Sequence, residues 1–128
     1  MGQPAAKQGD QVTATDQHLI QPPAPGPPVS TPMPFAGIIN GGLSPSVNIM
    51  GMPAATVNST AVNQPPHVPV GGTFVKPPSN QATIISGSAT VMINGNPAAR
   101  NGDTATTCND PADLPDGTVA AAGTVNLG

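Results

Sequence analysis

Three side chains of the metal-binding type stand out in this 128-residue chain: His18, His67 and Cys108. Each histidine lies 14 residues after the start of a Pro-Ala-Ala triplet, and the cysteine lies 11 residues after the start of a third triplet. Imidazole and thiolate groups together are typical ligands of tetrahedral zinc. The related spacing predicts that the three side chains meet at one end of the fold and hold one zinc ion. The alternative is that both histidines lie on the surface and that Cys108 is a small buried apolar residue.

The sequence leaves the fourth ligand of this zinc site open. A water molecule, Asp16, Asp110 or Met33 can complete the coordination. Water or a carboxylate is favoured over Met33, because a thioether is a weak ligand for zinc. A metal ion that joins three chain segments also contributes its binding free energy to folding.

Groups for acid–base catalysis are scarce. The sequence contains no Glu, and most of its Asp residues lie among Gly, Asn and Pro, where a carboxylate satisfies the backbone N–H groups of a turn. Asp10 and Asp103 each follow a Gly at the same distance after a triplet, which predicts turns. A zinc ion with an open position can activate water, but no general base is clearly placed beside it. We therefore expect no enzymatic activity, and a small zinc-dependent enzyme is the alternative.

The Pro-Ala-Ala triplet must position these residues, because it recurs along the whole chain. Its copies begin 49 and 44 residues apart, spacings typical of repeat architectures. They are Pro4-Ala5-Ala6, Pro53-Ala54-Ala55 and Pro97-Ala98-Ala99-Arg100. Similar segments, 47–52 and 91–96, precede the second and third copies. The first copy has such a segment only if the sequence is read as a circle, so that Val125–Gly128 continues into Met1–Gln3. The repeat therefore predicts adjacent termini and approximate three-fold symmetry.

Short strands and turns are predicted throughout, with essentially no helix. Runs of Val, Ile and Thr alternate with turn-forming pairs such as Asn-Gly, and Pro and Gly interrupt every candidate helix. Within residues 35–50, Ile38-Ile39 is predicted to form a hairpin with Val47-Asn48-Ile49, and the unit recurs at 84–93 and 118–127. Pro- and Gly-rich loops are expected at 19–34, 64–80 and 109–117. One unit cannot bury its apolar face alone, so we expect three units to cover one another around an axis.

Composition limits the possible classes of protein. The 18 Pro and 15 Gly residues reach a level found in disordered chains, so a Pro-rich, partly disordered surface protein is a further interpretation. The low net charge of −3 and the periodic Pro and Gly favour an ordered repeat fold instead. Three basic residues are too few to bind nucleic acid. We expect residues 1–128 to form one all-β domain with no membrane span and no effector extension.

At Asn96-Pro97-Ala98-Ala99-Arg100-Asn101-Gly102-Asp103 the sequence resembles the PAAR-repeat family, and the resemblance extends over essentially the whole chain. It implies a small pseudo-three-fold β-cone that caps the spike of a contractile injection system. It also implies a zinc ion near the apex, held by three His and one Cys. His18, His67 and Cys108 match that set, but this chain has only two His and is shortened near residues 31–35, where relatives can carry another.

The function implied by this resemblance is structural. One copy is expected to cap one trimer of a VgrG-like spike protein, in a type VI or extracellular phage-tail-like particle, and to sharpen it for envelope penetration. Contact with the target membrane is expected only on penetration. The protein would be made in the cytoplasm, assembled at the tip of the particle and delivered outside or into the target cell.

Overall fold

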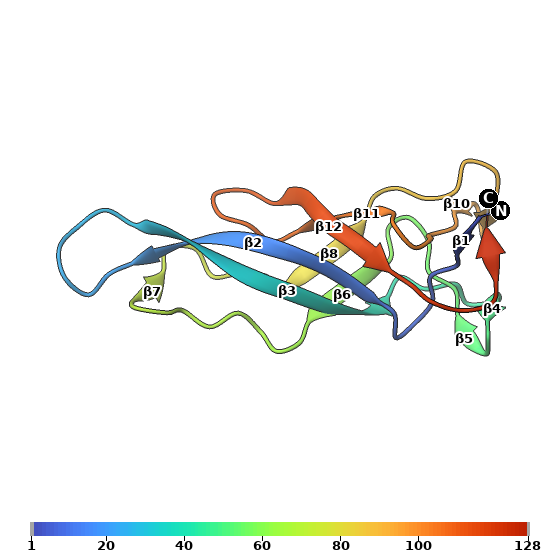
Figure 1. Ribbon diagram of the computed structural model, residues 1–128, viewed down its shortest axis with the longest axis horizontal. Coiled ribbons are helices and arrows are strands. Elements are labelled where there is room, and N and C mark those ends of the chain that lie inside the picture. The colour runs from blue at the N-terminus through green and yellow to red at the C-terminus, as the bar shows by residue number, and fades with distance from the viewer. Residues whose placement is uncertain (1, 128) are drawn as a thin grey trace.

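Short strands with alternating apolar and polar residues build the wall of the molecule. The computed structural model describes residues 2–127, and within them six strands close into a cone in the order β12-β11-β8-β6-β3-β2, with β12 paired to β2. These strands are β2 (Gln11–Gln21), β3 (Val29–Gly41), β6 (Thr60–Asn63), β8 (Gln81–Ile84), β11 (Thr104–Thr107) and β12 (Leu114–Ala120). The short β7 (Thr73–Phe74) adds to the far end of β2. The molecule narrows from a broad base, where both termini lie, to a pointed apex (Figure 1).

The interior of the cone is filled mainly by aliphatic and small side chains. Val12, Phe35, Ile39, Ile84 and Val119 are almost fully buried in one cluster. In the wall strands β6, β8 and β11, buried residues alternate with more exposed ones, as expected when one face of a sheet is buried. Residues 2–127 contain no helix, and so none that is long and apolar enough to cross a membrane. The predicted all-β fold is confirmed.

Within residues 2–127, the base consists of three short strand pairs around the axis. They are β1 (Gln3–Pro4) with β13 (Asn126–Leu127), β4 (Asn48–Ile49) with β5 (Met52–Pro53), and β9 (Met92–Ile93) with β10 (Asn96–Pro97). The pairing of β1 with β13 confirms that the two ends of the chain meet. Met1 and Gly128, which the sequence interpretation included in that junction, lie outside the described residues.

Three alanines, one from each triplet, form a closed ring of backbone hydrogen bonds, here called the alanine ring. The N–H of Ala6 donates to the carbonyl of Ala99 (2.9 Å), that of Ala99 to Ala55 (3.0 Å), and that of Ala55 to Ala6 (3.0 Å). All three residues are fully buried. Three chain segments converge here, so a side chain longer than a methyl group has no room. This crowding explains the second Ala of each triplet, while the first, in Ala5, Ala54 and Ala98, is buried in a separate cluster. The ring reflects the approximate three-fold symmetry of the fold.

The same tight turn follows each triplet. A side-chain oxygen accepts the backbone N–H of the residue three positions earlier, in the pairs Lys7–Asp10, Thr56–Ser59 and Arg100–Asp103. Gly9 and Gly102 have φ angles of +91° and +90° in two of these turns, a conformation that glycine adopts without steric cost. The carboxylates of Asp10 and Asp103 also form ion pairs at 3.0 Å within their turns. Their predicted role in turns is confirmed.

The pairing predicted for the three hairpins is wrong. Ile38 and Ile39 belong to β3, which pairs with β2 and β6, whereas residues 48–49 fold back on β5 at Met50-Gly51. Likewise, β8 and β12 join the wall of the cone, while β9 and β13 lie in the base. Alternation along a strand specifies which face is buried, but it does not specify which neighbour the strand pairs with.

Residues 19–34, predicted to be a connecting loop, instead form the end of a long hairpin. β2 continues to Gln21 and β3 begins at Val29, so the irregular turn covers only residues 22–28. Pro32 and Pro34 fit within β3 because, among the described residues, this part of the strand pairs only with β2 and the edge of a sheet tolerates proline. Parts of the other predicted loops are also strands, since 73–74 lie in β7 and 114–117 in β12.

Candidate metal centre

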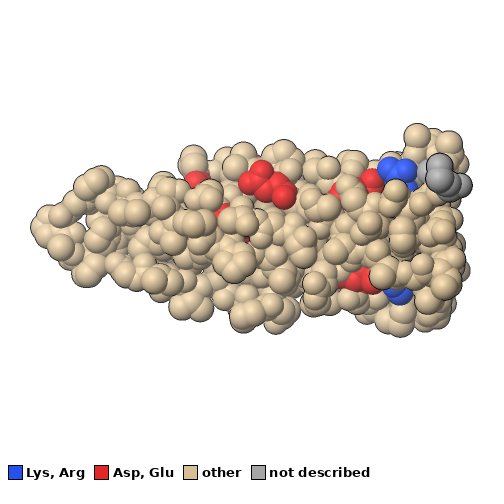
Figure 2. Space-filling view, viewed as in Figure 1, with Lys and Arg blue, Asp and Glu red and all other residues tan. Residues whose placement is uncertain are grey.

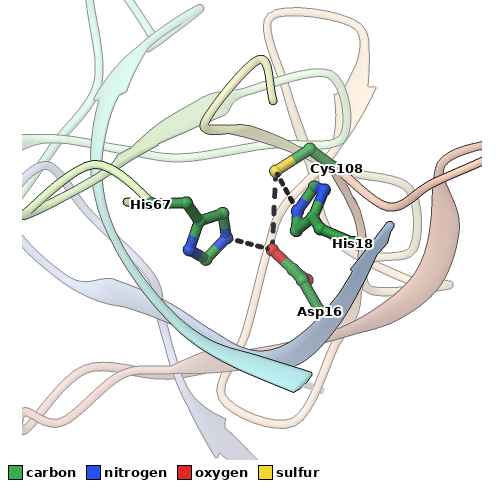
Figure 3. A group of neighbouring side chains, drawn as sticks. All are labelled: Asp16, His18, His67 and Cys108. Carbon is green, nitrogen blue, oxygen red and sulfur yellow. Dashed lines mark hydrogen bonds and ion pairs between the residues drawn. The ribbon is translucent and has the colours of Figure 1, made fainter. Parts of the chain in front are cut away.

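Four potential metal ligands converge inside the cone (Figure 3). Asp16 and His18 both come from β2, where residues two apart face the same side of the strand. His67 lies in the segment after β6, and Cys108 directly follows β11. One ligand atom from each of these four residues lies within 4.8 Å of the others. The structure therefore brings His18, His67 and Cys108 together and adds Asp16 to them.

Asp16 Oδ2 is the atom that connects this cluster. His67 Nε2 lies 2.8 Å from it, and Cys108 Sγ lies 3.4 Å from it. Cys108 Sγ is in turn 3.8 Å from His18 Nε2. All four side chains are buried, including that of His67, which is 3 % exposed. Interactions among these groups are therefore little weakened by solvent.

Contacts outside the cluster fix the orientation of the Asp16 carboxylate. The Thr107 hydroxyl donates to Asp16 Oδ1 at 2.6 Å. Asn109 supports Thr107 through hydrogen bonds to its carbonyl and hydroxyl oxygens, and it accepts the backbone N–H of Gln17 at 2.7 Å. The Oδ1 atom is thus occupied, which leaves Oδ2 to face the two histidines and the cysteine.

His67 is held in place by two asparagines. Its backbone N–H donates to Asn80 Oδ1 at 2.8 Å, and its Nδ1 lies 3.3 Å from Asn63 Nδ2. Asn63 is itself anchored, because its Oδ1 accepts the N–H of Ala36 at 2.9 Å. In contrast, His18 Nδ1 is buried without a hydrogen-bond partner among the described residues. An unpaired polar atom of this kind is unfavourable and marks the cluster as a site of function more than of stability.

Burial perturbs the protonation of two members of the cluster. Burial, with the nearby Asp16 carboxylate, raises the pKa of the Cys108 thiol to about 11, although hydrogen bonds from the Asn80 backbone and the Ser79 side chain act in the opposite direction. Burial, followed by the neighbouring His67, lowers the pKa of His18. Without a cation, the thiol therefore keeps its proton at neutral pH and His18 is uncharged.

Comparison with known protein families shows which fold surrounds this cluster. A family model described as PAAR motif matches residues 30–112 and again residues 76–126, which together make up most of the chain. The chain belongs to the PAAR motif family. No match was found among curated proteins. The resemblance first seen at Pro97-Ala98-Ala99-Arg100 is thus confirmed, and the alanine ring is the structural form of the PAAR motif in this chain.

The cluster in this PAAR protein fits a divalent metal ion. Two imidazoles, one thiolate and one carboxylate are all donors that zinc accepts, and bond lengths of about 2.0–2.3 Å in a tetrahedron place ligand atoms about 3.3–3.8 Å apart. The separations of Cys108 Sγ from Asp16 Oδ2 and His18 Nε2, 3.4 and 3.8 Å, are of this size. His67 Nε2 and Asp16 Oδ2 are closer, at the length of the hydrogen bond that joins them. A carboxylate and a thiolate would also balance the charge of a divalent cation.

The PAAR resemblance led to an expectation of three His and one Cys, and this chain supplies Asp16 in addition to two His and the Cys. Of the other fourth-ligand options, Asp110 is not part of the cluster within residues 2–127. Met33 is buried directly across from Asp16 in the pairing of β2 with β3. The sequence did contain a signal for Asp16, because it lies two residues before His18 in an alternating strand.

Proposed function

We propose that this PAAR protein is the tip of a contractile injection system, where it caps a trimeric VgrG-like spike and sharpens it for envelope penetration. The observation that carries the proposal is the repeated base. A single chain can match a three-fold partner only if it presents three similar surfaces. The ring of Ala6, Ala55 and Ala99 is surrounded by three similar strand pairs.

The surface of the base suits a protein partner. Met50 and Met52 in the β4–β5 pair, Met92 in the β9–β10 pair and Val125 beside β13 are exposed apolar residues. Methionine adapts its shape to a partner surface. The end of a β-helical spike carries unpaired strand edges that need to be covered, and three apolar corners of a flat base can cover them together.

Within the proposed function, the buried cluster binds one zinc ion through His18, His67, Cys108 and Asp16. The ion would hold β2, the segment after β6 and the end of β11 together on the apex side of the alanine ring. With four protein ligands zinc has no open position for a substrate, so we propose that the protein has no enzymatic activity. Reproducible hydrolysis of esters, peptides or phosphates that disappears in His67→Ala would contradict this.

We also propose where the protein acts: it is made in the cytoplasm, assembled on the spike and delivered outside the cell or into the target. The decisive experiment is the mass of the complex between this chain and the spike protein encoded beside it. One copy per spike trimer is expected, because the base as a whole matches the three-fold axis. Three copies per trimer, or no binding to any nearby spike, would contradict the proposal.

A further inference from the structure

The pointed end of the molecule carries no formal charge on its surface. We define the apex as residues 19–35 and 64–75, which contain no Lys, Arg, Asp or Glu. In Figure 2, the charged atoms lie over the middle and the base, while the narrow end is free of them. The one titratable side chain in the apex, His67, is turned into the buried cluster. Charged side chains make contact with hydrocarbon unfavourable. The apex lacks them, so contact with hydrocarbon is less unfavourable there than on the rest of the surface.

The hairpin of the apex, residues 19–35, also exposes few backbone hydrogen-bond donors. Five of the seven residues in the turn 22–28 are proline, which has no N–H group. In β3, Pro32 and Pro34 face the open edge of the strand, because within the described residues their only strand partner is β2 and a proline cannot donate to it. An N–H or a carbonyl without a partner is strongly unfavourable in hydrocarbon. The proline positions have no N–H group, and their carbonyls can be hydrated where the apex stays at the water interface of a bilayer.

Polar side chains of the apex are partly satisfied within the apex hairpin itself. Gln21 Nε2 donates to the carbonyl of Gly26 at 3.0 Å, and the Ser30 hydroxyl donates to Gln17 Oε1 at 3.1 Å. These groups therefore depend less on water than free side chains would. They do not offset the apolar character of the surrounding surface.

Apolar side chains cover much of this surface. Val29, Val68, Val70 and Val75 are each at least half exposed, with Val70 the most exposed at 70 %. Between the open edge of β3 and the segment after β6 runs a groove of about 520 Å³, lined largely by apolar residues that include Met33, Pro34, Pro65, Pro66, Val68 and Val70. An apolar groove flanked by exposed apolar side chains is typical of an interaction site.

We propose that the apex binds the surface of an uncharged lipid bilayer at equilibrium, without any force that drives it in. Its exposed apolar side chains would enter the outer part of the acyl chains, while the turn and the open edge of β3 stay in the hydrated interface. A protein partner is a poorer fit, because protein interfaces combine apolar contact with about one hydrogen bond per 100–200 Å², and the apex offers few donors. A narrow convex point also needs a matching socket in a protein, whereas lipid can surround it on all sides. This proposal depends on the proposed function in one respect only, namely that the apex points away from the spike.

A single introduced tryptophan can test this, because the chain contains no Trp and no Tyr. Ala24→Trp places the fluorophore in the exposed turn of the apex, and Ile85→Trp places it on an exposed residue outside the apex as a matched control. With vesicles of zwitterionic phosphatidylcholine, we expect a blue shift and quenching by lipids brominated in the acyl chains for Ala24→Trp only. Insensitivity to salt is expected, because no charge is involved.

Two further variants connect the signal to the apolar surface. Val68→Asp with Val70→Asp in the Ala24→Trp chain should weaken vesicle binding about tenfold or more, since charges are excluded from hydrocarbon. Ile85→Asp, at an exposed site outside the apex, should leave binding unchanged. No spectral change with vesicles, equal change for both tryptophans, or binding only to anionic vesicles would overturn the proposal. Each variant is also mixed with the spike trimer, so that loss of lipid binding with normal capping is distinguished from failure of the tip function.

Discussion

The alanine ring and the metal cluster join the same three repeats in opposite ways. In the ring, Ala6, Ala55 and Ala99 make one backbone hydrogen bond each, and the three bonds are nearly identical in length. In the cluster, β2 supplies two ligands and the other two repeats supply one each. The ring keeps the three-fold symmetry, and the cluster, which lies about ten residues further along the chain in each repeat, has lost it.

This difference follows from the groups that make the two sites. Backbone N–H and C=O groups are the same in every repeat, so any sequence that keeps the small side chains preserves the ring. A metal site needs particular side chains at particular distances, and here four ligands come from three repeats, so the repeats do not contribute equally. Symmetry is thus retained at the base, which is the surface proposed to meet a three-fold partner, and is lost at the cluster.

The strongest test of the ring is to fill it. Ala55→Leu should destabilise the protein by about 3 kcal/mol, because the added atoms enter a fully packed position. The measurement is the midpoint of denaturant unfolding, with Ala24→Leu in the exposed turn of the apex as the control. If Ala55→Leu unfolds at the wild-type midpoint, crowding does not explain the alanines.

The cluster should respond to loss of its ligands and not to loss of a nearby carboxylate. Cys108→Ala and Asp16→Asn should each reduce bound zinc from about one equivalent to none, as measured by metal analysis of protein purified without chelator. They should also abolish the stabilisation by metal, which is about 2.7 kcal/mol when free metal is about 100 times Kd.

Asp110→Asn is the matched control for Asp16→Asn, because both remove one negative charge and Asp110 lies outside the cluster. It should retain the metal and the stabilisation. Retention of zinc in Asp16→Asn together with its loss in Asp110→Asn would reassign the fourth ligand. A melting curve that metal never changes in the wild-type protein would remove the site altogether.

A smaller effect is expected from pH on the metal-free protein. The folded state lowers the pKa of His18 below its ordinary value of 6.5 through burial and the neighbouring His67. Below pH 6.5 the unfolded chain therefore takes up a proton that the folded chain does not, and the stability present above that pH is lost as pH falls through the folded pKa. We expect a slope of about 1 kcal/mol per pH unit from this residue.

The check on this effect is a pair of denaturation series in chelator at several values between pH 7 and 5. His18→Gln should flatten the slope relative to the wild-type protein, while His-independent changes from carboxylates persist in both. Identical slopes in the two proteins would show that His18 does not contribute to acid sensitivity.

Local sequence determined the parts of this protein that depend on short segments. The triplets at Pro4, Pro53 and Pro97 specify the turns that follow them, because the Ala pairs leave room at the axis. In two of these turns the acceptor is the carboxylate of Asp10 or Asp103, which lies three residues after the residue whose N–H it accepts. The circular form of the repeat likewise predicted that the chain ends pair. These features needed no knowledge of distant contacts.

Only the tertiary structure decided how the strands pair and which side chains share the cluster. Ile39 could bury its face against several neighbours, and it lies in β3 beside β6 because six strands must close around one core. Asp16 joins His67 and Cys108 because closing the cone brings β2, β6 and β11 close together. The spacing of these residues in the sequence does not give the distances between them in the fold. Repetition along a chain defines equivalent positions, whereas a metal site depends on distances across the fold, and those are set when the sheet closes.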